Sequence, residues 1–514
     1  MILNKIFGRL QVIKRARGDG DRAWASRAED SHRLYRVNLA ALVIILTTMS
    51  IQAQSLDARI TIVSPAQARI EGTLARAATA WSFRNAYAGV LNLGERIKDL
   101  KLADSGGNEV PVRKLAPGEY EAARGATRFN YTVALDPPSW TTDAAHVSWL
   151  AGERALLLPG DLLPLPLKDA KVSLVLPLGW VVASVETKNV NGEFELQDAE
   201  DALFFAGRDL RVRGGRAGAI EYTFVAAGEW AFADEEVADA VDGILKEHER
   251  TMGGAPARRR AMAVLAPFPR PAVASQWSAE TRGATVFLLS GRASSKIAGL
   301  AQLSVPLSHE LFHLWVPNSL ALDGAYDWFY EGFTMYQAMR AGMRLGSLNF
   351  QDYLNALGRA FDTYLATPGR AKFSLLDASQ RRWTTSAALV YNKGMLVAFL
   401  YDLTLQRQTS GKHSLDDVYR ELLRRCNLTE PRRDANGAVI EALSDFGGMR
   451  DFTRRYIETA AEIDLASMIA PFGLRAERAP TRVTVADSLS RAQRDLLRKF
   501  GYNEKAFASW QGPR

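Results

Sequence analysis

Cysteine and histidine are scarce in this chain of 514 residues, which holds a single cysteine, Cys426, and six histidines. One thiol excludes internal disulfide bonds, and residues 1–53 contain no cysteine that could carry a lipid. With so few histidines, any two at a metal-binding spacing are informative. The length exceeds what one hydrophobic core usually supports and predicts two or three domains.

Long apolar runs are lacking near the start as well. Residues 39–46 form an apolar run that is too short to cross a bilayer comfortably. The run follows the basic residues Arg33 and Arg36 and precedes a small-residue site that ends at Ala53. This order is typical of a cleaved signal peptide. We therefore expect a leader over residues 1–53 and a periplasmic or secreted protein without stable membrane insertion; a signal-anchor in the inner membrane is the alternative.

Dense blocks of one charge are rare after this leader. The formal net charge is +7, but lysines and arginines are interspersed with acids, and only residues 258–260 form a basic run. A solvated turn explains this run better than a binding surface does. We therefore expect no nucleic-acid partner, and the oligomeric state is not indicated.

The pattern of apolar residues changes along the chain. From about residue 58 to 225, short alternating runs are separated by Gly, Pro and Asn, which is typical of strands and turns. Helical periodicity begins at Asp234, with strand-like runs at 261–266 and 285–289, and dominates from 303 to about 470. The sequence predicts a multidomain protein, an all-β sandwich followed by an α+β, mostly helical domain. The expected limits are 54–230 for the sandwich, 231–475 for the second domain and 476–514 for a short carboxy-terminal extension.

Two of the six histidines, His309 and His313, lie in the segment HELFH. On a helix, residues four apart project from the same face, so both imidazoles can bind one metal ion. By chance, two histidines four residues apart with a glutamate directly after the first would occur in about one chain of this composition in a hundred, or fewer. The alternative is an amphipathic helix whose histidines are merely hydrogen bonded. We favour a metal site, with Zn2+ as the expected ion.

A catalytic zinc ion takes three protein ligands and leaves its fourth position to water. The next helical pattern supplies Glu331 within WFYEGFT. A carboxylate among aromatic residues needs compensation, which a metal ion would provide; a partly exposed glutamate is the alternative. Asp327, one turn earlier, is a candidate to orient a ligand histidine, although an acid at a helix start explains it equally well.

Zinc chemistry assigns the remaining roles. Glu310, which is not a ligand, is the expected general base that takes the proton of the attacking water and passes it to the leaving amine. The tetrahedral intermediate also needs a hydrogen-bond donor. Tyr391 is a candidate, although most of the 15 tyrosines are expected to serve packing.

Three segments resemble the gluzincin metallopeptidases and, among them, the glycyl aminopeptidase family, metallopeptidase family sixty-one. They are HELFHLW at 309–315, WFYEGFTMY at 328–336, and 391–422, where Tyr-x-Lys-Gly is followed by Ser-Leu-Asp-Asp. The resemblance covers about residues 235–475 and implies a thermolysin-like catalytic domain behind the β-sandwich. It also implies the site residues, with the metal ligands His309, His313 and Glu331, the base Glu310 and the oxyanion donor Tyr391.

The chain also departs from this family. Residues 314–330, 17 in number, separate the second histidine from Glu331, fewer than usual, so a shortened loop is expected. Related aminopeptidases bind the free amine of their substrate through an acid on an edge strand before the zinc helix. We expect that strand at 283–290, and no Asp or Glu occurs between Gly283 and Ser308. The choice between exopeptidase and endopeptidase therefore stays open. About 40 residues follow Leu474, so the PDZ domain common in this family is not expected.

We predict a zinc-dependent metallopeptidase that hydrolyses peptide bonds in a peptide or protein substrate. One alternative is a catalytically silent peptidase fold that serves as a binding or scaffold protein. The presence of all three ligands and of Glu310 argues against it. The other alternative is a zinc hydrolase with a non-peptide substrate, which the sequence does not exclude.

Overall fold

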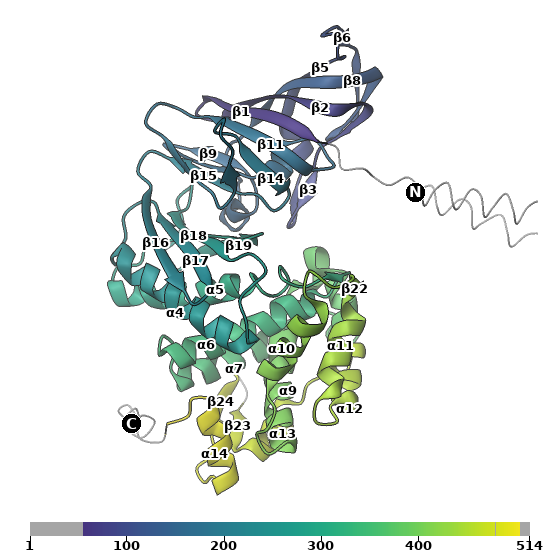
Figure 1. Ribbon diagram of the computed structural model, residues 1–514. Coiled ribbons are helices and arrows are strands. Elements are labelled where there is room, and N and C mark those ends of the chain that lie inside the picture. Colours follow the sequence, from purple (N-terminus) through teal and green to yellow (C-terminus); the bar gives the residue numbers. More distant parts are fainter. Residues whose placement is uncertain (1–54, 478–479, 504–514) are drawn as a thin grey trace, which may run out of the picture. The chain divides into compact units, whose positions relative to one another are not determined.

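The computed structural model describes residues 55–477 and 480–503 (Figure 1). The predicted leader, residues 1–53, lies outside these ranges. Within them, no helix is long and apolar enough to cross a membrane.

The amino-terminal part of the described chain is rich in β-structure. A nine-stranded sheet has the order β13-β14-β11-β1-β2-β8-β5-β6, with β7 paired to β8, and a four-stranded sheet has the order β12-β15-β10-β9. Their strands are β1 (Leu56–Ser64), β2 (Gln67–Ser82), β5 (Ile97–Ala103), β6 (Glu109–Val110), β7 (Val112–Ala116), β8 (Glu119–Ala134), β9 (Trp149–Ala151), β10 (Arg154–Leu157), β11 (Lys168–Val175), β12 (Val181–Ala183), β13 (Thr187–Lys188), β14 (Phe194–Asp198) and β15 (Phe204–Gly207). The hairpin β3 (Ala86–Tyr87) and β4 (Val90–Leu91) and the short helices η1 (Leu93–Arg96), η2 (Thr141–Ala145) and α3 (Pro159–Leu162) complete this part.

Side chains alternate along these strands as the sequence pattern predicts. In β1, Leu56, Ala58 and Ile60 are buried and the residues between them are exposed, because successive side chains of a strand point to opposite faces. Buried residues of both sheets form one hydrophobic cluster, in which Ile60 and Phe204 are examples. The prediction of an amino-terminal β-rich region is therefore confirmed.

A third sheet supports the candidate site. Its order is β16 (Arg211–Ala217), β17 (Ile220–Ala226), β18 (Arg260–Pro267), β20 (Thr285–Ser290) and β19 (Trp277–Arg282). β17, β18 and β20 are parallel, whereas β19 is antiparallel to β20 and lies at the edge. The strands predicted at 261–266 and 285–289 are confirmed as β18 and β20.

Both faces of this sheet are covered. Ala261, Ala263 and Leu265 of β18 pack in one cluster with the helices α4 (Asp234–Met252) and α5 (Lys296–Phe312). The alternate residues Met262 and Val264 pack in another cluster with residues of the four-stranded sheet. Strands that are buried on both faces are expected to be apolar throughout, as these are. The boundary predicted at residue 230 runs through this sheet, since β16 and β17 precede it.

Helices dominate the rest of the chain. They are α6 (Thr334–Leu345), α7 (Phe350–Ala366), α8 (Leu375–Ser379), α9 (Gly394–Gln408), α10 (Leu415–Cys426), α11 (Ala435–Asp445), α12 (Arg450–Thr453), α13 (Leu465–Ile469) and the short η7 (Ala470–Phe472). Four turns are π-helical, namely η3 (Trp328–Phe333), η4 (Arg382–Ser386), η5 (Leu389–Lys393) and η6 (Arg454–Glu458). Strands β21 (Leu322–Asp323) and β22 (Arg433–Asp434) pair with each other.

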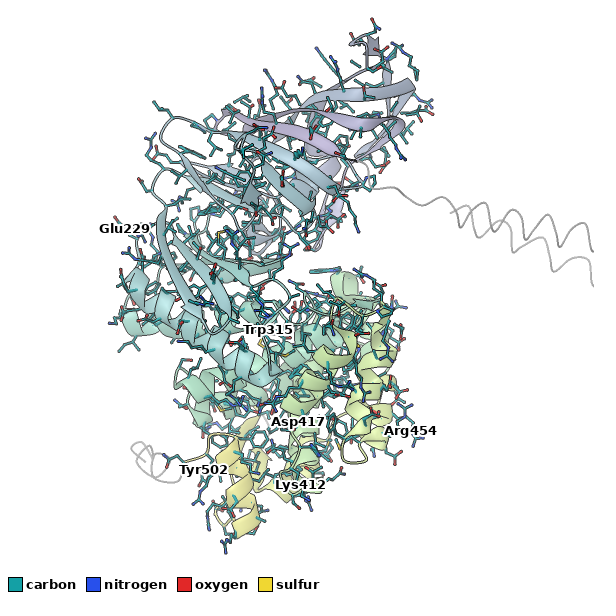
Figure 2. All side chains as sticks on the ribbon, in the orientation of Figure 1. Glu229, Trp315, Lys412, Asp417, Arg454 and Tyr502 are labelled. Carbon is teal, nitrogen blue, oxygen red and sulfur yellow. The ribbon has the colours of Figure 1, made fainter. Side chains whose placement is uncertain are left out.

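The carboxy-terminal segment packs on these helices. It contains β23 (Leu474–Glu477), β24 (Arg482–Val485) and α14 (Arg491–Lys499). Thr481 donates from its backbone nitrogen to Asp362 of α7. The fully buried Trp315, labelled in Figure 2, donates from its indole nitrogen to Gly254 O at 2.8 Å. This contact joins the end of α5 to the end of α4.

Candidate metal centre

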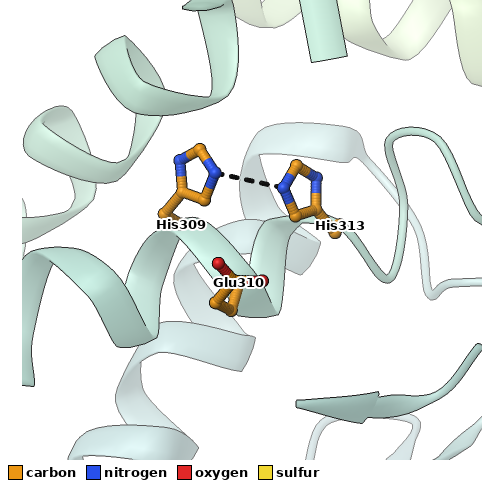
Figure 3. A group of neighbouring side chains, drawn as sticks. All are labelled: His309, Glu310 and His313. Carbon is orange, nitrogen blue, oxygen red and sulfur yellow. Dashed lines mark hydrogen bonds between the residues drawn. The ribbon is translucent and has the colours of Figure 1, made fainter. Parts of the chain in front are cut away.

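The end of α5 carries the HELFH segment. The helix begins at Lys296 and is capped by Ser295, whose side chain accepts from Ala298 N. Its last residues, 307–312, are all buried. His309 lies in its last turn, and His313 lies where the helix ends. The Nε2 atoms of the two rings point toward each other and lie 3.1 Å apart. Glu310 lies on the helical turn between the two histidines (Figure 3). The helix thus brings the two predicted histidine ligands together.

Glu331 on η3 completes the group. Its Oε2 lies 3.0 Å from His309 Nε2 and 3.7 Å from His313 Nε2. A tetrahedral zinc ion with bonds of about 2.1 Å has ligand atoms about 3.4 Å apart. The three side chains are buried, with 5 to 7% of their surface exposed. The donor types, their spacing and their burial therefore fit a zinc ion.

Proximity alone would also admit Glu310 as the third ligand. The candidate ligand atoms of His309, Glu310 and His313 lie within 4.8 Å of one another. Glu331 is the better donor, because one oxygen, Oε2, lies 3.0 and 3.7 Å from the two ring nitrogens, close to the spacing of zinc ligands. The carboxylate of Glu310 instead lies 2.6 Å from the hydroxyl of Thr281, which donates to it. Glu310 is therefore held beside the metal position without being needed as a ligand.

The histidine rings are oriented by the backbone. His313 Nδ1 lies 2.8 Å from Val316 O and donates to it, which leaves the lone pair of Nε2 for a metal ion. Nδ1 of His309 has no hydrogen-bond partner among the described residues. Asp327, which the sequence offered as an orienting acceptor, contacts neither ring. It pairs with Arg382 at 3.0 Å and accepts from Tyr330 at 2.7 Å. That interpretation of Asp327 is wrong.

Tyr391 lies on η5 beside the same group. Its ring centre is 6.4 Å from that of His309, and its hydroxyl accepts from Arg382 Nη2 at 2.7 Å. Burial and the charge of Glu331 raise the pKa of Tyr391 well above its usual value, although Arg382 opposes them. The phenol is thus protonated at neutral pH, as a hydrogen-bond donor must be.

Glu331 remains a carboxylate in spite of its burial. Burial raises its pKa, but the charges of Arg382 and His313 outweigh this effect and hold the pKa well below its usual value. An ionised oxygen is the form that binds a metal ion.

Two glycines bring Glu331 and Tyr391 together. A Cβ on Gly332 would lie 2.5 Å from Val390 O and 2.6 Å from Gly394 Cα. A Cβ on Gly394 would lie 2.9 Å from Gly332 Cα. Only glycine permits such a close approach of the two backbones. The turns η3 and η5 are therefore in direct contact, which places their functional side chains on the same site.

Arg382 and Thr281 are site residues that the sequence did not indicate. Arg382 lies on η4 and its Nη2 is 2.8 Å from Glu331 Oε1. Thr281 lies on β19 and reaches Glu310. Both contacts join segments far apart in the sequence, so no local spacing could reveal them.

The edge strand is also different from the prediction. Residues 283–290 contain the interior strand β20, and the edge strand is β19, which includes Glu280. The expectation of an edge strand without an acid is therefore wrong. Burial raises the pKa of Glu280, but His146 and further partners lower it to about 2, so the group is ionised. Its carboxylate contacts His146 Nδ1 and accepts from Tyr87 at 2.5 Å.

The fold and the site together define a class: a β-rich region followed by a helical domain in which two histidines of an HExxH helix meet a glutamate from a later helical turn. This is the ligand set of the gluzincin metallopeptidases. The family described as M61 glycyl aminopeptidase matches residues 302–397, a segment that includes the five residues predicted for the site. The predicted resemblance to this family is confirmed.

Solved structures share the fold. An aminopeptidase N family protein from Idiomarina loihiensis is 18% identical in sequence, and its structure superposes with a TM-score of 0.71. The match covers 83% of this chain and 79% of that protein's chain. An M1 zinc metallopeptidase from Deinococcus radiodurans is 15% identical, with a TM-score of 0.54 and coverage of 80% and 95%. The comparison with curated proteins finds no match. The family match and the two folds support a zinc metallopeptidase.

Proposed function

We propose that this chain is a zinc-dependent metallopeptidase that hydrolyses peptide bonds, with a thermolysin-like arrangement of its catalytic domain. The observation that carries the proposal is the group of three donor atoms, from His309, His313 and Glu331, that lie 3.0 to 3.7 Å apart. These residues would hold the zinc ion. When bound, zinc would activate a water molecule and polarise the scissile carbonyl.

Glu310 is the proposed general base. Its carboxylate is fixed by the hydroxyl of Thr281 at 2.6 Å, so one oxygen keeps a set position beside the ligand histidines. From this position it takes a proton from the attacking water and delivers it to the leaving amine. Tyr391 is the proposed donor to the oxygen on which negative charge develops.

We further propose that the peptide lies along β19. This strand is the edge of its sheet, and among the described residues no strand pairs with its outer side, where an extended substrate could add. Thr281 connects the strand to Glu310, so a peptide placed there passes the base. In a related structure, an M1 zinc metallopeptidase from Deinococcus radiodurans is bound to a Tyr-Ser-Ala substrate. The proposed periplasmic or extracellular location rests on the pattern of residues 1–53.

The test is a purified chain that begins at Gln54, with measured bound zinc and an assay on peptide libraries with free and with blocked amino termini. We expect stoichiometric zinc and cleavage in the wild type, and zinc without cleavage in Glu310→Gln. Glu229→Gln, which changes an exposed glutamate, serves as the matched control and should cleave normally. Cleavage that survives Glu310→Gln contradicts the mechanism. A folded protein without bound metal contradicts the site, and zinc with no cleavage of any peptide favours the scaffold or the non-peptide alternative.

A further inference from the structure

We propose that Arg382 is the positioning residue that fixes the third metal ligand, Glu331, and the proposed oxyanion donor, Tyr391, relative to each other. The proposal rests on the proposed function, because it assigns Arg382 a task within that site.

Both terminal nitrogens of the guanidinium group contact protein side chains. Nη1 lies 3.0 Å from Asp327 Oδ1 and 3.0 Å from the hydroxyl of Tyr330. Nη2 lies 2.8 Å from Glu331 Oε1 and 2.7 Å from the hydroxyl of Tyr391. The contacts with Asp327, Tyr330 and Tyr391 are hydrogen bonds, and the contact with Glu331 is an ion pair. The terminal nitrogens of Arg382 are therefore placed to hold its neighbours.

The first consequence concerns Glu331. Arg382 binds its Oε1, and the other oxygen, Oε2, faces the two histidine nitrogens. A carboxylate held in this way offers a metal ion one oxygen. Without the arginine, the group could turn and offer both. Arg382 thus sets how many ligand atoms the site presents.

The second consequence concerns Tyr391. Its hydroxyl accepts from Arg382, and a guanidinium group can only donate. The phenol can therefore donate its proton to an acceptor that lies towards Glu331 and the histidines. One nitrogen, Nη2, contacts both Glu331 and Tyr391, and the planar guanidinium group fixes its position because Nη1 is held by Asp327 and Tyr330. A lysine, with a single nitrogen, cannot keep both sets of contacts.

The backbone supports this arrangement. Arg382, Glu331 and Tyr391 lie on η4, η3 and η5, which are all π-helical turns. Such turns recur at functional sites because they shift side chains out of the regular helical path. The side chain of Arg382 is 10% exposed, so its contacts form in a largely dry environment where ionic hydrogen bonds are strong.

The experiment compares Arg382→Gln and Arg382→Lys with Arg381→Gln, an exposed neighbour that lies over the ring of Phe373. Each variant is loaded with cobalt(II) in place of zinc, and its visible absorption, kcat and KM are measured, alone and combined with Tyr391→Phe. Melting curves verify that each variant is folded, and the lysine variant carries the test if the glutamine variant is not.

We expect Arg382→Gln and Arg382→Lys to lower kcat about tenfold to a hundredfold with little change in KM, as for other partners of metal ligands. Their cobalt absorption should weaken, because a second oxygen of Glu331 raises the coordination number. In the Tyr391→Phe background the loss of kcat should shrink to about threefold or less, because one nitrogen of Arg382, Nη2, contacts both Glu331 and Tyr391. Arg381→Gln should match the wild type in every measurement.

Other outcomes overturn the assignment. An unchanged cobalt spectrum, or a loss of kcat that adds fully to that of Tyr391→Phe, removes Arg382 from the positioning role. So does a lysine that restores wild-type behaviour, because a lysine has one nitrogen and cannot keep the contacts of both Nη1 and Nη2. A wild-type protein that binds cobalt but cleaves no peptide overturns the proposed function, and the cobalt spectrum of the variants then decides the role of Arg382. A wild-type protein that binds no metal overturns both.

Discussion

Two arginines, Arg340 and Arg382, are buried between pairs of carboxylates in the same helical region. Their side chains are 6% and 10% exposed. Arg340 Nη1 lies 2.6 Å from Asp416 Oδ1 and 3.6 Å from Asp402 Oδ2. Arg382 lies 3.0 Å from Asp327 and 2.8 Å from Glu331. By composition alone the two networks would be assigned the same role.

The carboxylates around Arg340 have a protein partner for every oxygen. Asp402 Oδ1 accepts from Leu415 N at 3.0 Å, and its Oδ2 accepts from Tyr336 at 2.7 Å. The two oxygens of Asp416 accept from Arg340 and Arg344. This network joins α6, α9 and α10 and is complete without any further ion.

The network around Arg382 is open at one point. Oε2 of Glu331 faces two imidazole nitrogens, and His313 Nδ1 donates to the backbone, so His313 can bind a metal ion only through Nε2. Two nitrogen lone pairs and an ionised oxygen that converge in a buried site favour a cation. The comparison teaches that metal-ligand atoms from several side chains that converge on one point, more than the presence of buried charge, distinguish a candidate site from a structural network.

Removal of the metal should have the largest effect and should act only on the open network. We expect a chelator to abolish peptide cleavage, because zinc activates the water in the proposed mechanism. If free zinc stands about a thousandfold above its dissociation constant, its loss also lowers the free energy of unfolding by about 4 kcal/mol. Activity assays and urea unfolding with zinc and with chelator measure both effects. Cleavage by a protein verified to be free of metal would contradict the site.

Arg340→Met should break the closed network instead. It leaves Asp402 and Asp416 buried without their shared cation, which costs about 3 to 5 kcal/mol of unfolding free energy. The loss should be the same with zinc and with chelator, since no atom of this network faces the metal position. Urea unfolding measures it, with the exposed Arg359→Met on α7 as control. A change below about 1 kcal/mol would mean that the network contributes little.

Tyr391→Phe should affect chemistry and leave stability nearly unchanged. Loss of a donor to a developing oxyanion lowers turnover by about a hundredfold or more. Steady-state kinetics measure the loss, and melting curves verify the fold. Tyr364→Phe removes a hydroxyl that accepts from Ile463 N elsewhere in the helical region and should keep full turnover. Equal turnover in the two variants would assign Tyr391 to packing.

The sequence could predict the parts of the site that depend on local spacing. His309 and His313 share a helix face, and the aromatic neighbours of Glu331 indicated a carboxylate in need of a partner. Tyr391 followed from the family resemblance. Arg382 could not be predicted, because its partners Glu331 and Tyr391 meet it only after three separate turns pack together.

The edge strand was misplaced for a physical reason. Thr285–Ser290 is apolar over most of its length, which is typical of a strand buried on both faces, and β20 indeed lies between two others. Trp277–Arg282 mixes polar and apolar residues, as edge strands do, and carries Glu280. The β-rich and helical regions were predictable from periodicity. The pairing of β17 with β18 across residue 230 was not, because it joins segments that no local pattern connects.

Lys393 is a third buried cation and extends the comparison. It has neither a closed network like that of Arg340 nor an open one like that of Arg382. Its side chain is fully buried, and Nζ has no hydrogen-bond partner among the described residues. Burial lowers the pKa of Lys393 from 10.5 to about 8. Between these values the unfolded chain binds more protons than the folded chain, so the unfolding free energy rises with pH. Below pH 8 the full cost of the buried charge remains.

Lys393→Met removes this dependence. The variant should be more stable than the wild type below about pH 8, by at most about 3 kcal/mol, and the difference should vanish towards pH 10.5. Urea unfolding at several pH values measures the difference between the two proteins, so that other titrating groups cancel. The exposed Lys372→Met should show no such trend. A difference that stays constant with pH would mean that Lys393 keeps its proton in the folded protein, held by the charge of Glu462, which opposes the effect of burial.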